Sequence, residues 1–371
     1  MMDERITKLA HNLVNNSCKV QKGEHVLINT IGQDTIDLAR ALIKEIHQAG
    51  GYPHIELKDT SITREMYLAA SETQLTEMND YELYKMKKMD AFIGIRSTDN
   101  TYEYVDVPNE NVELTDKLMD PVLRQRVDHS KWVVLRYPNG SMAQAAKMSK
   151  EAFEDYYFNV CNLDYAKMAD AMEHLKKMME ATDKVTIKGL DTDLTFSIKG
   201  IPVIPCAGEM NIPDGEIYTA PVKDSINGTL SYNTPNQYMG FVFEKIKFTF
   251  ENGKIVDAVS NDTKKINSIL DTDEGSRFIG EFAIGVNPYI TKPMLDTLFD
   301  EKITGSFHFT PGASYEDAFN GNKSAVHWDL VCMQTPEYGG GELYFDGKLI
   351  RKDGRFVLPE LECLNPENLI D

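Results

Sequence analysis

The pattern of apolar and polar residues changes near residue 183, and this change constrains the fold more than any other feature. Up to about residue 140, apolar runs that predict short buried strands (HVLINT, YPHIEL, DAFIGIR and WVVLRYP) alternate with stretches of helical periodicity. Strands that alternate with helices favour a parallel sheet, because each helix returns the chain to the same end of the sheet. We therefore predict that residues 1–183 form an α/β domain with a parallel sheet.

The second half has the pattern of antiparallel hairpins. Runs such as VTIKG, KIKFTF and GELYF alternate apolar with polar residues, and Asn-Gly and Asp-Gly pairs stand between them. Such pairs favour tight hairpin turns, because both residues accept a positive φ. Residues 262–281 are predicted to form one helix within this half. The prediction for residues 184–371 is a β-rich α+β domain, and the candidate metal ligands described below all fall in it.

Residues 149–183, just before the predicted boundary, have helical periodicity. Met168, Met172, Leu175 and Met179 fall on one side of the stretch LDYAKMADAMEHLKKMMEAT. A stripe of this kind is more typical of a core or a subunit interface than of a cofactor site.

The charge balance argues against a nucleic-acid partner. The chain has 371 residues, of which 39 are basic and 58 acidic, so its formal net charge is −19. No basic excess is available to neutralise phosphates, whereas acidic clefts favour cations. No run approaches the ~20 apolar residues that a membrane span needs. The first residues, MMDERITKLAHNLVNN, lack the apolar core of a signal peptide. We therefore expect no membrane partner.

The cysteines predict a reducing compartment. They are odd in number and scattered, and no Cys-x-x-Cys pair occurs, which argues against disulfides and zinc fingers. A cytoplasmic location is therefore expected. Neither a G-x-G-x-x-G after a strand nor a Walker A sequence is present, so nucleotide binding has little support. Without a G-x-S-x-G elbow or a Cys/His signature, covalent catalysis has little support either.

The segment Ser306–Cys332 holds the densest group of candidate metal ligands. His327 and Asp329 are two residues apart in VHWDLV, which predicts a strand. Alternation would put both side chains on one face, roughly 6–7 Å apart. An imidazole beside a carboxylate suits a divalent metal, although a single H-x-D is more often a structural hydrogen-bonded pair. His308 lies in a second strand-like run, GSFHF, and Tyr315 lies in the loop between the two runs.

Three glutamates strengthen this metal hypothesis. Glu216 follows a Pro-Asp-Gly turn, Glu281 lies within an apolar run, and Glu301 shortly precedes His308. A carboxylate that enters an apolar environment needs a partner charge. Each glutamate alone has an ordinary explanation, such as a turn cap, the solvent face of a helix or an exposed loop. The set as a whole favours a shared metal site.

These segments together resemble the aminopeptidase T/aminopeptidase S family of two-metal aminopeptidases. The resemblance runs along the whole chain in the same order. It rests on the motifs WVVLRYPNGSMAQAAKMSKEAFEDYYF, NIPDGEIYTAP, DEGSRFIGEFAIG, LFDE and VHWDLV, and on Tyr315 seven residues after His308. The stretch between Glu301 and His308 is longer here than in the family pattern, and the loop after His308 carries TPGAS.

The resemblance implies a ligand set for two divalent ions, which are zinc, cobalt or manganese. Glu281 would lie between the two ions, and the hydroxyl of Tyr315 would donate to the oxyanion. The remaining implied ligands are Glu216, Glu301, His308, His327 and Asp329. The family further implies a homodimer that releases apolar, Leu-like residues from peptides with a free amino terminus.

Two other hypotheses stay open at this point. The same site would serve another metal-dependent amide hydrolase, such as a dipeptidase or an acylase. A non-enzymatic α/β binding protein with purely structural carboxylates is the second alternative, and it predicts no tightly bound metal.

Overall fold

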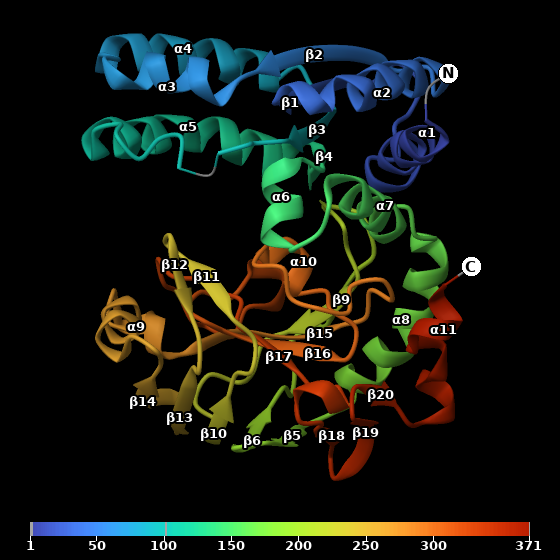
Figure 1. Ribbon diagram of the computed structural model, residues 1–371, viewed down its shortest axis with the longest axis vertical. Helices are drawn as coiled ribbons and strands as arrows, with labels where there is room; N and C mark the ends of the chain where they lie inside the picture. The colour runs from blue at the N-terminus through green and yellow to red at the C-terminus, as the bar shows by residue number, and fades with distance from the viewer. Residues whose placement is uncertain (1–2, 101, 371) are drawn as a thin grey trace. The chain divides into compact units, whose positions relative to one another are not determined.

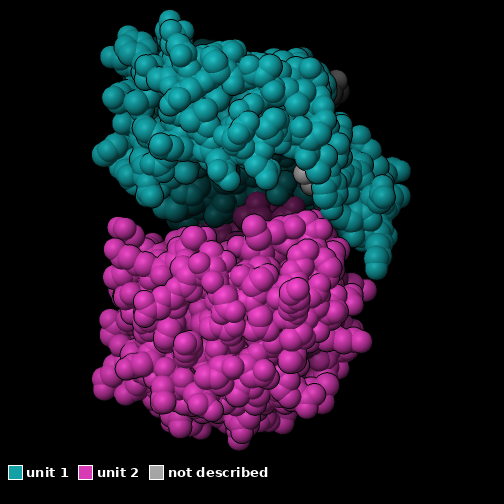
Figure 2. Space-filling model, turned by 90° about the vertical axis from the view of Figure 1, so that its left-hand side faces the viewer, with its two compact units in different colours: residues 1–162, 208–212 teal, residues 163–207, 213–371 magenta. Residues whose placement is uncertain are grey.

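The computed structural model describes residues 3–100 and 102–370. Contacts group the chain into two units, residues 1–162 with 208–212 and residues 163–207 with 213–371, which Figure 2 colours separately. The first unit contains the α/β part of the sequence, and the second unit contains the β-rich part. The contacts divide the chain after residue 162, and they do not test the domain boundary that we predict at residue 183, which stays a prediction.

The first unit is built on a five-stranded sheet in the order β2-β1-β3-β4-β8 (Figure 1). Every neighbouring pair of strands in it runs parallel, which confirms the predicted sheet type. The strands are β1 His25–Ile31, β2 Tyr52–Lys58, β3 Ala91–Arg96, β4 Lys131–Arg136 and β8 Asn211–Ile212. The helices are α1 Glu4–His11, α2 Ile36–Gln48, α3 Thr60–Leu68, α4 Glu72–Met86, α5 Asn109–His129, α6 Gly140–Ala145 and α7 Lys150–Cys161.

One strand of this sheet differs from its prediction. YPHIEL was predicted as a buried strand, but β2 lies at the edge of the sheet, and Tyr52, Ile55 and Leu57 are exposed. A short apolar run indicates a strand without showing whether neighbours cover both of its faces.

The second unit contains two antiparallel sheets and a small hairpin (Figure 1). The larger sheet has the order β14-β13-β10-β6-β5-β18-β19-β20, the smaller has the order β17-β16-β15-β9-β7, and β11 pairs with β12. The strands of the larger sheet are β5 Lys184–Gly189, β6 Thr192–Ser197, β10 Asn227–Ser231, β13 Lys247–Glu251, β14 Lys254–Val259, β18 Glu342–Phe345, β19 Lys348–Lys352 and β20 Arg355–Phe356. The others are β7 Ile204–Cys206, β9 Glu216–Thr219, β11 Asn236–Tyr238, β12 Phe241–Phe243, β15 Ile279–Gly285, β16 Ser306–Pro311 and β17 Val331–Met333. The helices are α8 Tyr165–Glu180, α9 Thr263–Leu270, α10 Thr297–Asp300 and α11 Pro366–Leu369.

The predicted hairpin turns are present. Asn252 and Gly253 join β13 to β14 with φ values of 48° and 85°, and Asp346 and Gly347 join β18 to β19 with 48° and 82°. Two successive positive φ values belong to the type of turn whose twist matches that of the two strands.

Aromatic side chains between the two sheets form the core of the second unit. Phe196 on β6 lies 5.0 Å, between ring centroids, from both Phe282 on β15 and Phe309 on β16. Side chains alternate along a strand, so the residues beside Phe282 and Phe309 project from the opposite face of the smaller sheet. That opposite face carries the polar residues of the candidate site. The methionine stripe of α8 is buried as well, which confirms its role in a core.

The predicted helix over residues 262–281 is wrong beyond Leu270. The segment continues as a short 3₁₀ turn, Glu274–Arg277, and then as strand β15. The Asp273 side chain caps the turn by accepting hydrogen bonds from the amides of Gly275 and Ser276. The apolar run FIGEFAIG is buried on both faces as a strand, and a short apolar run does not distinguish this arrangement from a buried helix.

Among the described residues, no helix combines the length and the apolar character needed to cross a membrane.

Candidate metal centre

Three neighbouring strands of the smaller sheet carry the first part of the site. Glu281 lies on the middle strand β15, Glu216 on β9 and His308 on β16. His308 pairs with Ala283, and Glu216 pairs with Gly285. The longer side chains from the three strands converge on one side of the sheet, and the backbone at Ile303 approaches Gly285 closely.

His327 and Asp329 approach from a segment that is extended but is not the predicted strand. His327 forms only an isolated bridge with Gly312, and regular pairing begins at β17. Trp328 lies between them, is buried, and stacks on Tyr238 with a centroid distance of 4.7 Å. Because Trp328 points the other way, His327 and Asp329 project to the same side, as predicted for a strand.

Glu281 connects two groups of possible ligands. Its Oε1 lies 3.2 Å from Nε2 of His308, and its Oε2 lies 3.3 Å from Nε2 of His327. His308 Nε2 also lies 3.4 Å from Glu216 Oε2, and His327 Nε2 lies 3.2 Å from Asp329 Oδ1. The first group is therefore Glu216, Glu281 and His308, and the second is Glu281, His327 and Asp329. Five of the seven predicted site residues meet here.

Unsatisfied polar atoms show that this donor set fits a cation. Within the described residues, Glu216 Oε2 and His327 Nε2 are buried without a hydrogen-bond partner of good geometry, and so is His308 Nδ1. Buried polar atoms are rarely left unpaired, and Glu216 Oε2 and His327 Nε2 each face another member of the group, which favours a bound ion. The other ring nitrogen of His327, Nδ1, lies 2.8 Å from the carbonyl oxygen of Ala313, and Asp329 accepts from Thr310 at 2.8 Å. Outer contacts of this kind orient metal ligands.

The charges of the group stabilise one another. Burial opposes protonation of the two imidazoles, but the carboxylates outweigh it and raise the pKa of His308 to about 10 and of His327 to about 12. Burial raises the pKa of Glu281 and Asp329, yet the two imidazoles outweigh it and lower both values. The carboxylates thus favour positive charge at the imidazoles, and divalent ions supply the same charge when they displace protons.

Glu301 is linked to the first group through Lys302, which forms ion pairs with both Glu301 and Glu216. It follows α10, and its Oε1 contacts the ammonium of Lys302, whose Nζ also lies 3.0 Å from Glu216 Oε1. Burial and the charge of Glu216 raise the pKa of Glu301, against the effect of Lys302. Its role as a ligand stays a prediction. Sequence reasoning missed Lys302, because Asp-Glu-Lys has the character of an exposed loop.

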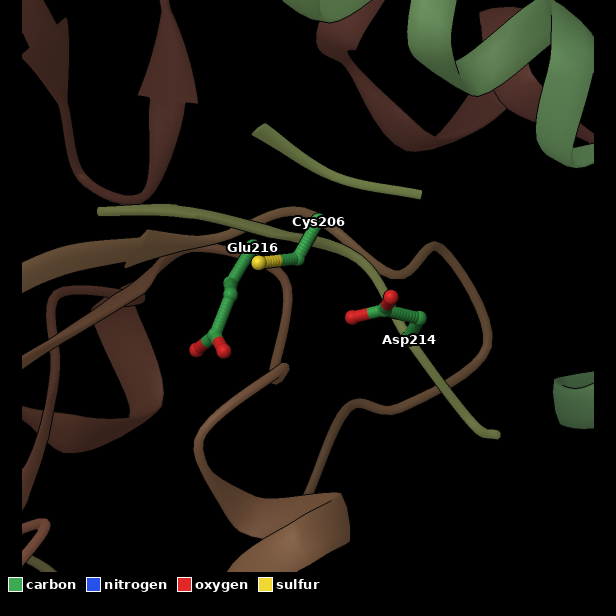
Figure 3. A group of neighbouring side chains, drawn as sticks. All are labelled: Cys206, Asp214 and Glu216. Atoms are coloured by element: carbon green, nitrogen blue, oxygen red, sulfur yellow. The ribbon is translucent and has the colours of Figure 1, made fainter. Parts of the chain in front are cut away.

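A third group of donors adjoins Glu216. Cys206 pairs with Glu216 across β7 and β9, and one donor atom from each of Cys206, Asp214 and Glu216 lies within 4.8 Å of the others. Figure 3 shows the thiol beside the Glu216 side chain, with the Asp214 carboxylate directed towards them. Burial and Asp214 raise the pKa of the Cys206 thiol well above its usual value. A neutral thiol is a poor ligand, so this group is the weakest of the three. No motif in the sequence marks Cys206 or Asp214 as a possible metal ligand.

Tyr315 stands at the edge of the site. Its ring centroid lies 4.7 Å from that of His327 and 5.6 Å from that of Tyr218, and its side chain is about half exposed. Tyr218 is held in turn by Asp317, whose carboxylate oxygens accept its hydroxyl at 2.9 Å. Desolvation and the charge of Glu281 raise the pKa of Tyr315, so its hydroxyl keeps its proton and can donate it in a hydrogen bond.

Comparison with known proteins gives both a family and a fold. A profile of the family described as "Thermophilic metalloprotease (M29)" matches residues 2–356. The chain is 26% identical to Aminopeptidase AmpS of Bacillus subtilis (strain 168) over 369 residues, which cover 88% of each protein. Wild-type AmpT from Thermus thermophilus has a similar structure, with a TM-score of 0.79 at 21% identity, over 96% of this chain and 100% of that one.

A second solved structure shares the fold. The 2,5-dihydroxypyridine dioxygenase from Pseudomonas putida KT2440 matches with a TM-score of 0.61 at 12% identity, over 96% of this chain and 98% of that one. A dioxygenase, as that protein is called, carries out a reaction other than peptide hydrolysis. The fold alone therefore does not decide the chemistry, and the donor set must do so.

Proposed function

The chain belongs to the thermophilic metalloprotease (M29) family, and from this premise we propose that it is a metallo-aminopeptidase that hydrolyses peptides from the amino end. The observation that carries the proposal is the position of Glu281, whose two oxygens face different histidines. A carboxylate in this position suits two cations that share it.

The proposed ligand set follows from the two groups. Glu216, Glu281 and His308 would hold one ion, and Glu281, His327 and Asp329 would hold the other. All the donors are carboxylate oxygens or imidazole nitrogens, which suits zinc, cobalt or manganese. When bound, such ions lower the pKa of a coordinated water towards ~7 and polarise the scissile carbonyl.

Side chains of this protein supply the remaining chemistry. We propose Glu281 and Tyr315 as the catalytic residues. Glu281 is 3% exposed and lies between two imidazoles, so it holds the two ligand groups next to each other. The Tyr315 hydroxyl would donate a hydrogen bond to the carbonyl oxygen as that oxygen gains negative charge. The packing of the Tyr315 ring on His327 supports this role, because it keeps the tyrosine beside the site.

Tyr315→Phe removes only the hydroxyl and keeps the ring contacts with His327 and Tyr218. We expect kcat to fall by roughly 10²–10³, as for other lost oxyanion donors, while the metal content stays unchanged. Steady-state kinetics on leucine-p-nitroanilide and elemental analysis measure the two quantities. Tyr81→Phe is the matched control, since Tyr81 is 77% exposed and lies outside the second unit. An unchanged rate would make Tyr315 a packing residue only.

Direction of cleavage tests the proposed function. An unblocked heptapeptide with leucine at its amino end should give a ladder of products that lose one residue at a time from that end. The same peptide with an acetylated amino group should be inert, because the cap removes the charge that an aminopeptidase must recognise. Mass spectrometry of both digests at equal enzyme concentration gives the result.

Other product patterns would identify the competing functions. Cleavage of dipeptides alone would indicate a dipeptidase, and turnover of the acetylated form would indicate an acylase. Internal fragments, or release from the carboxyl end, would reject the aminopeptidase assignment and leave the metal site intact.

We also propose that the protein acts as a cytoplasmic homodimer on peptides with a free amino terminus. The family resemblance supports the dimer and the substrate, and the scattered cysteines support the compartment. Sedimentation of the purified protein tests the dimer directly.

A further inference from the structure

Lys302 is a buried cation beside the proposed metal ligands. Its side chain is 1% exposed, its Nζ lies 3.0 Å from Glu216 Oε1, and it also contacts Glu301 Oε1. Lysine is almost never fully buried unless it is paired, so both carboxylates are needed to hold it there.

The backbone fixes this lysine in place. The carbonyl oxygen of Lys302 accepts from the amide of Asn287, just after β15, at 3.0 Å, and its amide donates to Phe299 in α10 at 3.1 Å. Gly285 makes the close approach possible, because a Cβ there would lie 2.4 Å from the carbonyl oxygen of Ile303. The backbone of Lys302 is therefore held beside Glu216 by contacts that do not depend on that carboxylate.

The two ligand groups consequently differ in charge. In the first group, one oxygen of Glu216 is taken by the ammonium, and only Oε2 faces His308. In the second group, Asp329 meets His327 and the hydroxyl of Thr310, and no lysine or arginine pairs with it among the described residues. A cation entering the first group meets a carboxylate that already contacts an ammonium, and that positive charge repels the cation at short range.

We propose that Lys302 competes with the divalent ion of the first group for Glu216, so that this ion binds more weakly than the ion of the second group. The inference rests on the proposed metal function, and it explains why the two ions would bind with different affinities. Lys302 thus tunes the affinity of one metal without contacting substrate.

Titration of metal-free protein with Zn²⁺ against a chromophoric chelator tests this. The unmodified protein should show two classes of site. Lys302→Met keeps an unbranched side chain but removes the charge, and it should tighten the weaker class about 10- to 100-fold, the range typical of changes in outer contacts. The tighter class should change little. Lys348→Met is the matched control, because Lys348 forms an exposed ion pair with Glu360 in the same unit and should alter neither class.

Asp329→Asn identifies which class belongs to which group. This change weakens the second group only, so the effect of Lys302→Met on the first group can be measured alone in that background. If Lys302→Met fails to fold by circular dichroism, Lys302→Gln removes the charge but keeps a hydrogen-bond donor for the two carboxylates, and the same titration decides the question.

The outcomes separate this inference from the proposed function. Two bound ions with an unchanged weaker class would overturn the inference and leave the function standing. Loss of the weaker class would also overturn it, because Lys302 would then orient Glu216 instead of competing for it. Failure of the unmodified protein to bind Zn²⁺ at all would reject the proposed function itself.

Discussion

Glu281→Gln should lower turnover by several orders of magnitude while the fold persists. The amide has nearly the same size, but it carries no charge, and only one of its two polar atoms is an acceptor. Since each Glu281 oxygen faces one histidine, the substitution affects both ligand groups at once. Steady-state kinetics on leucine-p-nitroanilide should therefore show a loss of kcat, and elemental analysis should show a loss of bound metal.

Glu274→Gln is the matched control for this variant. Glu274 is exposed in the 3₁₀ turn just before β15, so its neutralisation should change neither turnover nor metal content. If the Glu281→Gln protein keeps both ions and normal turnover, Glu281 is not the shared ligand, and the proposed site is wrong.

Removal of metal should abolish turnover completely. The five converging donors are carboxylate oxygens and imidazole nitrogens, and none of them is the hydroxyl or thiolate that peptidases with a serine, threonine or cysteine nucleophile use. Dialysis against a chelator should give inactive protein, and added cobalt, zinc or manganese should restore its activity. Circular dichroism before and after dialysis monitors the fold.

The chelator itself needs a control. Chelator saturated with zinc beforehand should leave turnover unchanged, since it can no longer withdraw the ions. Full activity in protein shown by elemental analysis to be metal-free would reject a metal mechanism and would favour a different use of the same carboxylates.

Local patterns predicted most of the fold, and the failures have physical causes. Asn252-Gly253 specifies its hairpin through backbone preferences alone, so the sequence is sufficient there. The run FIGEFAIG contains one polar residue, Glu281, which is too little to mark one face, and only its neighbours in the sheet make it a strand. The edge position of β2 likewise depends on which strands add beside it.

Site residues could be predicted where their spacing along the chain determines the side to which their side chains project. The two-residue step from His327 to Asp329 puts both side chains on one side of an extended chain, and this holds without a regular strand. Lys302 could not be predicted, because its burial depends on Gly285 admitting the backbone after α10. Cys206 and Asp214 come near Glu216 only through the pairing of β7 with β9 and the turn before β9.

The most direct test of the central claim, that Glu281 is shared by two divalent ions, is anomalous diffraction at the zinc edge from crystals grown with Zn²⁺. We predict two anomalous peaks that both contact Glu281, one also touching Glu216 and His308, and the other touching His327 and Asp329. A single peak, or peaks that do not share Glu281, would contradict the claim.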